Sequence, residues 1–156
     1  MKTTLIIQNK KFNSILRELN SLEENRKFCH HDITHLIEVA RIMLLINEKE
    51  QLKLDHDIIV ATALLHDLGR VKEYTIGTNH RFSSLEEITE ILRECTYQDS
   101  EINIIIEAIS LHNNSSAIPL ANLLYRADKL SRPCYLCKAK NECYWDNNIK
   151  NKRYYK

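Results

Sequence analysis

ATALLHDLGR, residues 61–70, is an apolar run that ends in an adjacent histidine and aspartate and then reaches a glycine. From Ile58 to Leu65 every residue except Thr62 is apolar, which predicts a helix buried in a core rather than one lying on a surface. We expect Gly69 to stop this helix, because glycine readily takes the left-handed conformation that follows many helix ends. Asp67 would then lie out of water at the negative end of the helix dipole, where an unpaired carboxylate is costly and a divalent cation would offset the cost.

Length and composition favour a single all-α domain. The chain has 156 residues, of which 44% are hydrophobic, enough for one core and too few for two domains of ordinary size. It contains only two glycines and two prolines, which predicts long helices with short connections rather than a sandwich or a barrel. We therefore treat 1–156 as one domain, with a core of about 12–132 and a cysteine-containing C-terminal extension at 133–156.

The charge balance and the apolar runs argue against several classes of function. Lys and Arg number 22 against 21 Asp and Glu, so neither nucleic acid nor a membrane surface is an expected partner. The apolar run from Ile42 to Ile46 is far too short to span a bilayer, and the first eleven residues do not resemble a signal peptide. We expect a cytoplasmic protein whose five cysteines are reduced thiols or metal ligands.

Hydrophobic spacing predicts a succession of amphipathic helices with polar connections. Asp32 is the expected cap of one of them, Asp55 or His56 opens another, and Ser100 is the expected cap of a third. The predicted helices cover 12–25, 33–47, 56–67, 85–95, 101–112 and a segment that begins at Pro119, and the predicted loops cover 71–79 and 113–116.

Three ionisable residues fall on the apolar faces of these predicted helices. His35 begins a series of inward positions with steps of 4, 3 and 4, Asp128 lies four residues after Leu124, and Asp67 ends the buried helix. With His66 they supply two imidazoles and two carboxylates, a donor set that suits Mn, Fe, Co, Ni or Zn and leaves positions for water and substrate. Metal sites in helical bundles are assembled in this way from side chains of several helices.

The order His, His-Asp, Asp resembles the HD superfamily of metal-dependent phosphohydrolases. The resemblance covers about 28–132 and includes VARI at 39–42, ALLHDLGR at 63–70 and ADKL at 127–130. It implies a single-domain, all-α HD-type helical bundle that binds one or two divalent metal ions. The core metal ligands that it implies are His35, His66, Asp67 and Asp128.

The same resemblance implies further candidates around this site. His80 and His112 stand where members with a second metal carry additional histidines, although Asn79 replaces the first of the two consecutive histidines often found there. Without a second metal, His112 would be a hydrogen-bonded core histidine and His80 a loop residue. The candidate substrate contacts are Arg70, Lys129 and His31, and the alternative for both basic residues is a solvated side chain.

A group of cysteines follows the last ligand. Cys134-x-x-Cys137 and then Cys143 have part of the pattern of a zinc site and would suit an iron–sulfur cluster equally well, with Cys29, Cys95 or a histidine as the fourth ligand. The alternative is three ordinary reduced thiols.

The function that the resemblance implies is hydrolysis of a nucleotide or a related small phosphate ester. Metal-activated water would be the nucleophile, and Asp67 is the expected catalytic residue that orients this water. Two alternatives remain: an HD-type di-iron oxygenase that uses all six candidate ligands, and a non-catalytic metal- or redox-sensing module in which the cysteines respond.

Overall fold

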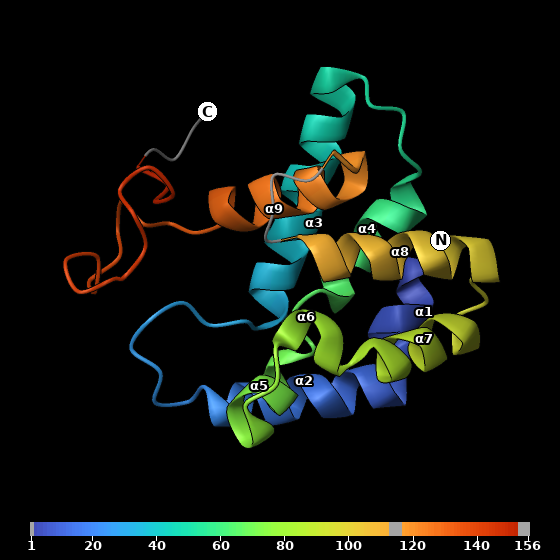
Figure 1. Ribbon diagram of the computed structural model, residues 1–156, viewed down its shortest axis with the longest axis horizontal. Coiled ribbons are helices and arrows are strands. Elements are labelled where there is room, and N and C mark those ends of the chain that lie inside the picture. The colour runs from blue at the N-terminus through green and yellow to red at the C-terminus, as the bar shows by residue number, and fades with distance from the viewer. Residues whose placement is uncertain (1, 113–116, 153–156) are drawn as a thin grey trace.

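The computed structural model describes residues 2–112 and 117–152, and in these ranges the regular structure is entirely helical (Figure 1), which confirms the all-α prediction. The predicted loop at 113–116 lies outside the described residues. The helices are α1 (Thr3–Gln8), α2 (Lys10–Leu22), α3 (Ile33–Glu50), α4 (His56–Leu65), α5 (Arg70–Ile76), α6 (His80–Ser83), α7 (Leu85–Glu94), α8 (Asp99–Leu111) and α9 (Pro119–Leu130). Among the residues that the structure describes, no helix combines the length and the apolar character needed to cross a membrane.

Helix α4 lies at the centre of the bundle and joins two parts of the core. Leu64 and Leu65 pack in the part formed with α1, α2, α7 and α8, whereas Ile59 and Ala63 pack in the part formed with α3 and α9. The larger of these side chains, Ile59, Leu64 and Leu65, are each worth about 1.5–3 kcal/mol when fully buried. The predicted buried helix is therefore confirmed, and its burial fixes the position of the His66-Asp67 pair that follows it.

Several helix ends are formed as the sequence predicts, and others are not. Asp32 accepts a hydrogen bond from the His35 amide at 2.9 Å, and Asp55 accepts one from the Ile58 amide at 3.1 Å, so both predicted caps are confirmed. Ser100 as the cap of α8 is wrong: the helix begins at Asp99, and the Glu101 carboxylate accepts from the Gln98 amide at 2.7 Å.

The first predicted helix, 12–25, is also different in the structure. The chain bends at Asn9 between α1 and α2, and the Asn9 side chain accepts from the Phe12 amide at 3.0 Å. Helix α2 therefore begins at Lys10 and ends at Leu22, shortly before a buried Glu23.

The predicted loop at 71–79 is wrong, because α5 occupies most of it. Val71 is the only buried residue of this short helix, so its sequence carries no apolar stripe that would have predicted a helix. Gly77 ends α5 in the left-handed conformation, with φ of 73°. His80, expected on the same loop, is the first residue of α6.

Gly69 has a different role from the expected left-handed stop. Its φ of −64° and ψ of −14° are right-handed helical values that any residue adopts. A Cβ atom at this position would lie 1.8 Å from the carbonyl oxygen of His80. Gly69 is therefore needed for the close approach of α6 to the turn that carries the histidine and the aspartate.

Residues 131–152, after α9, form turns rather than helices and lie beside the connection from α2 to α3, at the left of Figure 1. The Phe28 and Tyr144 rings meet edge to face at 6.3 Å, and Lys27 pairs with Glu142. The C-terminal extension is therefore packed against the segment that leads into α3.

Candidate metal centre

Four side chains from three parts of the chain meet beside the end of α4. They are His35 of α3, His66 and Asp67 of the turn after α4, and Asp128 of α9, and each offers a ligand atom within 4.8 Å of the others. His35 Nε2 lies 3.4 Å from Asp67 Oδ2 and 3.3 Å from Asp128 Oδ1. All four residues are buried, so the structure brings the expected core ligands together out of water.

Two atoms of this group have no hydrogen-bond partner although both are buried: His66 Nε2 and Asp67 Oδ2. They lie 2.9 Å apart without the alignment of a hydrogen bond. His66 Nδ1 donates to the Ala63 carbonyl at 2.7 Å, so the other ring nitrogen, Nε2, faces the site. Arg70 Nε donates to Asp67 Oδ1 at 2.8 Å, so the second carboxylate oxygen, Oδ2, is left facing the site. Buried polar atoms are rarely left unpaired, and a divalent cation fits both.

The charges of the two carboxyl groups also fit a metal site. Burial raises the pKa of Asp67, but His66 and Arg70 outweigh burial and hold the pKa well below its usual range. Burial also raises the pKa of Asp128, yet the adjacent His35 and the charge of Lys129 hold it low. Both carboxyl groups are therefore ionised at neutral pH, as metal ligands must be.

His112 and His80 extend this group into a row of imidazoles. The His66 and His112 rings are 5.7 Å apart, and the His112 and His80 rings are 5.5 Å apart. His112 Nδ1 donates to the Ile109 carbonyl at 2.6 Å, and His80 Nδ1 lies 2.9 Å from Glu73 Oε1. His80 Nε2 is buried without a partner, but neither residue joins the four-residue group within 4.8 Å, so their role at a second metal remains a prediction.

The two basic residues expected to contact phosphate are each paired with a ligand carboxylate. Arg70 bridges Asp67 and Glu73, with Nη1 at 2.9 Å from Glu73 Oε2. Lys129 Nζ lies 2.6 Å from Asp128 Oδ2. Both therefore orient the centre, and contact with substrate remains a prediction for them.

Arg132 is a basic residue of the site that the sequence reasoning missed. Its Nη2 donates to His35 Nε2 at 2.9 Å, its Nη1 donates to the His30 carbonyl at 2.5 Å, and its buried Nε has no partner. The available signal was its position four residues after Asp128, a spacing that brings the two side chains near each other although Arg132 follows the end of α9.

Glu23 is the second missed residue, and it positions His31. Its carboxylate accepts from the His31 amide at 2.7 Å and from the Tyr74 hydroxyl at 2.6 Å, and lies 2.5 Å from His31 Nδ1. Burial raises the pKa of Glu23, but these hydrogen bonds outweigh burial and bring it to about 2. The other ring nitrogen of His31 lies 4.0 Å from Asp67 Oδ2, so this histidine faces the centre.

The cysteines lie away from this centre. Cys134, Cys137 and Cys143 line a cavity of about 280 Å³ together with Cys29, whereas Cys95 is buried in the core beneath α7.

Comparison with known proteins assigns the family. A family model described as HD domain matches residues 32–132, a range that contains all four residues of the centre and more than half of the chain. The chain is 41% identical over 150 residues to an uncharacterized protein of Clostridium beijerinckii (strain ATCC 51743 / NCIMB 8052), and the alignment covers 96% of each chain. No solved structure matches the chain. The sequence motif, the helical fold and the family model agree, and the chain belongs to the HD domain family.

Proposed function

We propose that this HD-domain protein is a metal-dependent phosphohydrolase that acts on a nucleotide or a related small phosphate ester. The observation that carries the proposal is the unpaired couple of His66 Nε2 and Asp67 Oδ2, 2.9 Å apart in a buried group of two histidines and two aspartates. This donor set suits Mn, Fe, Co, Ni or Zn. When bound, such a cation supplies a Lewis acid for a phosphoryl oxygen and lowers the pKa of a coordinated water.

Asp67 is the residue of this chain that we assign to orienting the attacking water. Arg70 holds one carboxylate oxygen at 2.8 Å, so the carboxylate cannot rotate away from the site. The other oxygen, Oδ2, faces His66 and His35 and is free to accept a hydrogen bond or a cation. Because the pKa of Asp67 is held well below its usual range, the carboxylate keeps its charge throughout the neutral pH range.

Arg132 is the residue that we assign to binding the anionic substrate. Its Nη2 occupies the lone pair of His35 Nε2, the same atom that faces Asp67 and Asp128. When that lone pair is used for a metal, Nη2 is released and, beside Nε, can bind a phosphate oxygen, an anion that guanidinium groups bind in bidentate fashion. The unpaired Nε of Arg132 adds a further donor in the same place.

A panel of nucleotides and phosphate esters tests the proposal. Protein purified without oxygen is supplied with Mn, Fe, Co or Ni, and the products are separated by chromatography. We expect phosphate release from one substrate class and its loss in Asp67→Ala. Undiminished turnover in Asp67→Ala would contradict the assignment of this site.

A second candidate function, an HD-type di-iron oxygenase, has one observation in its favour. His80 Nε2 is buried without a partner, and His112 lies between His66 and His80 in the row of rings, as a six-ligand site would require. Oxygen consumption by iron-loaded protein, lost in both His80→Ala and Asp67→Ala, would favour this function. Phosphate release that survives His80→Ala would favour hydrolysis at a single metal.

A further inference from the structure

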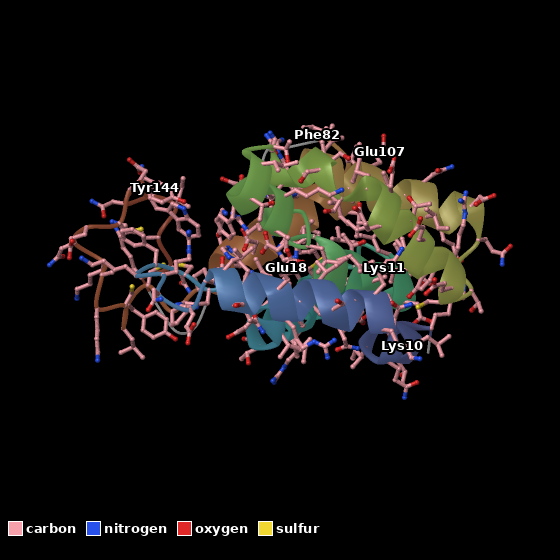
Figure 2. The ribbon with its side chains drawn as sticks, turned by 90° about the horizontal axis from the view of Figure 1, so that it is seen from below. Lys10, Lys11, Glu18, Phe82, Glu107 and Tyr144 are labelled. Carbon is pink, nitrogen blue, oxygen red and sulfur yellow. The ribbon has the colours of Figure 1, made fainter. Side chains whose placement is uncertain are left out.

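Four of the five cysteines surround one cavity outside the metal centre. Cys29 belongs to the connection between α2 and α3, whereas Cys134, Cys137 and Cys143 belong to the C-terminal extension. These two segments are about a hundred residues apart in the sequence. Figure 2 shows yellow sulfur atoms in this part of the molecule, near the labelled Tyr144. All five cysteines are free thiols, so no disulfide explains why the chain collects them here.

The local backbone around Cys134 and Cys137 resembles that of a metal-binding turn. The Leu136 amide donates to the Pro133 carbonyl at 2.9 Å, and the Cys137 amide donates to the Cys134 carbonyl at 3.3 Å. These bonds make a tight turn with one thiol at each end. Structural zinc sites commonly take two ligands from such a Cys-x-x-Cys turn and two from elsewhere in the chain.

The charges around the cavity suit an anionic metal complex. The ionisable residues of its lining, apart from the thiols and His30, are all basic: Lys27, Arg132, Lys140 and Lys150. Zinc held by four thiolates carries a net charge of about −2, which these cations would offset. Burial, the largest cause, and the neighbouring thiols raise the pKa of Cys29, although Arg132 opposes them.

We propose that Cys29, Cys134, Cys137 and Cys143 form a tetrathiolate zinc site that joins the C-terminal extension to the α2–α3 connection. The spacing Cys-x2-Cys-x5-Cys matches neither of the common iron–sulfur spacings, which favours zinc over a cluster. No three of the described sulfur atoms lie within 4.8 Å of one another, whereas Zn–S bonds of about 2.3 Å require sulfur atoms about 3.8 Å apart. The thiols must therefore close on the ion, and the turns of 133–152 allow this because no helix fixes them.

The site has a consequence for the metal centre because its ligands flank two residues of that centre. Cys29 precedes His31 by two residues, and Cys134 follows Arg132 by two residues. Arg132 already links both segments through its 2.5 Å bond to the His30 carbonyl. Zinc would hold the two segments together and so keep His31 and Arg132 in place beside Asp67 and His35.

Cobalt substitution of the full-length protein tests the proposal. Tetrahedral thiolate-bound Co²⁺ gives a thiolate-to-cobalt charge-transfer band in the near ultraviolet, which Co²⁺ bound by histidine and aspartate does not. We expect this band in the wild type and in His66→Ala, together with one zinc ion per chain in His66→Ala protein purified without chelator. Addition of zinc should bleach the band.

Single substitutions identify the ligands. Cys29→Ser and Cys137→Ser should each lose the charge-transfer band and the zinc ion, whereas Cys95→Ser, which alters the buried cysteine that follows α7, should keep both. Cys29→His keeps a zinc ligand at the same position and should retain zinc even if the serine variant is unstable. The proposal would be overturned if either Cys29→Ser or Cys137→Ser kept the full charge-transfer band. It would also be overturned if the purified protein contained iron and sulfide in place of zinc.

Discussion

Arg132 shows how a single residue connects the metal centre with the rest of the chain. It donates to the His35 nitrogen that faces the ligand carboxylates and to the backbone of the connection before α3. Its guanidinium is buried, so removing it takes away directed N–H donors that no solvated lysine replaces.

Arg132→Ala should therefore raise KM for a phosphorylated substrate by roughly ten- to a hundredfold, because hydrogen bonds to charged groups are worth about 1.5–3 kcal/mol. Steady-state kinetics should show a smaller change in kcat. Arg126→Ala is the matched control, since Arg126 lies on α9, shortly before Arg132, but pairs with Glu50 at the surface. Equal KM values for the two variants would contradict the role given to Arg132.

Glu23 gives a prediction for the pH dependence of stability. Its pKa is about 2 in the folded protein against an ordinary value of 4.5, so the ionised carboxylate stabilises the fold above pH 4.5, and this stability is lost as the pH falls from 4.5 towards 2. Glu23→Gln should lower the free energy of unfolding by about 2 kcal/mol at neutral pH. Urea denaturation should show the gap between wild type and variant narrowing in that acidic window.

The exposed neighbour Glu24 is the control for this measurement. Glu24→Gln should leave the free energy of unfolding nearly unchanged at both ends of the window, because its side chain is solvated. A gap for Glu23→Gln that stays constant with pH would show that the carboxylate is not ionised in the folded protein.

The residues of the centre were predictable to different degrees. His35 and Asp128 could be placed inward because each lies on a regular helix with apolar neighbours at helical spacing. Glu23 could not be placed inward, because it follows the end of α2 and its partners, His31 and Tyr74, come from the connection before α3 and from α5. Such tertiary contacts leave no periodic signal in the sequence.

At the scale of elements, the turn between α4 and α5 determines the shape of the centre. Because Gly69 has no side chain, α6 approaches it closely: a Cβ atom added to Gly69 would lie 1.8 Å from the carbonyl oxygen of His80. The turn therefore carries His66 and Asp67 on one side and supports the start of α6 on the other.

Gly69→Ala should lower the free energy of unfolding by about 3 kcal/mol, because backbone atoms must move to relieve the overlap. Gly77→Ala, with φ of 73° and open space around the new Cβ, should cost about 1 kcal/mol from backbone strain alone. Chemical denaturation of both variants measures the difference. Equal losses would show that close approach at Gly69 is not what requires a glycine.

The elements themselves followed from the sequence where a cap or a strong apolar stripe marked them. Asp32 and Asp55 placed the starts of α3 and α4, and the apolar run from Ile58 to Leu65 placed the buried helix. Helix α5 was missed because it is short, mostly polar and stabilised by packing against α2 rather than by its own propensity.

At the scale of the whole molecule, the metal centre joins α3, the end of α4 and α9, which are far apart along the chain. A cation bound there would stabilise the folded state only, so the free energy of unfolding should rise by about 2.7 kcal/mol at a metal concentration a hundred times the Kd. Because α4 packs against both parts of the core, it ties the two parts to this centre.

Calorimetric titration of chelator-treated protein with Mn²⁺ tests the central claim most directly, since a hard cation selects the carboxylate and imidazole site over the thiols. We expect saturable binding in the wild type and in Cys137→Ser, and no binding in a folded His66→Ala protein. Undiminished Mn²⁺ affinity in His66→Ala would show that the four-residue group is not the metal centre.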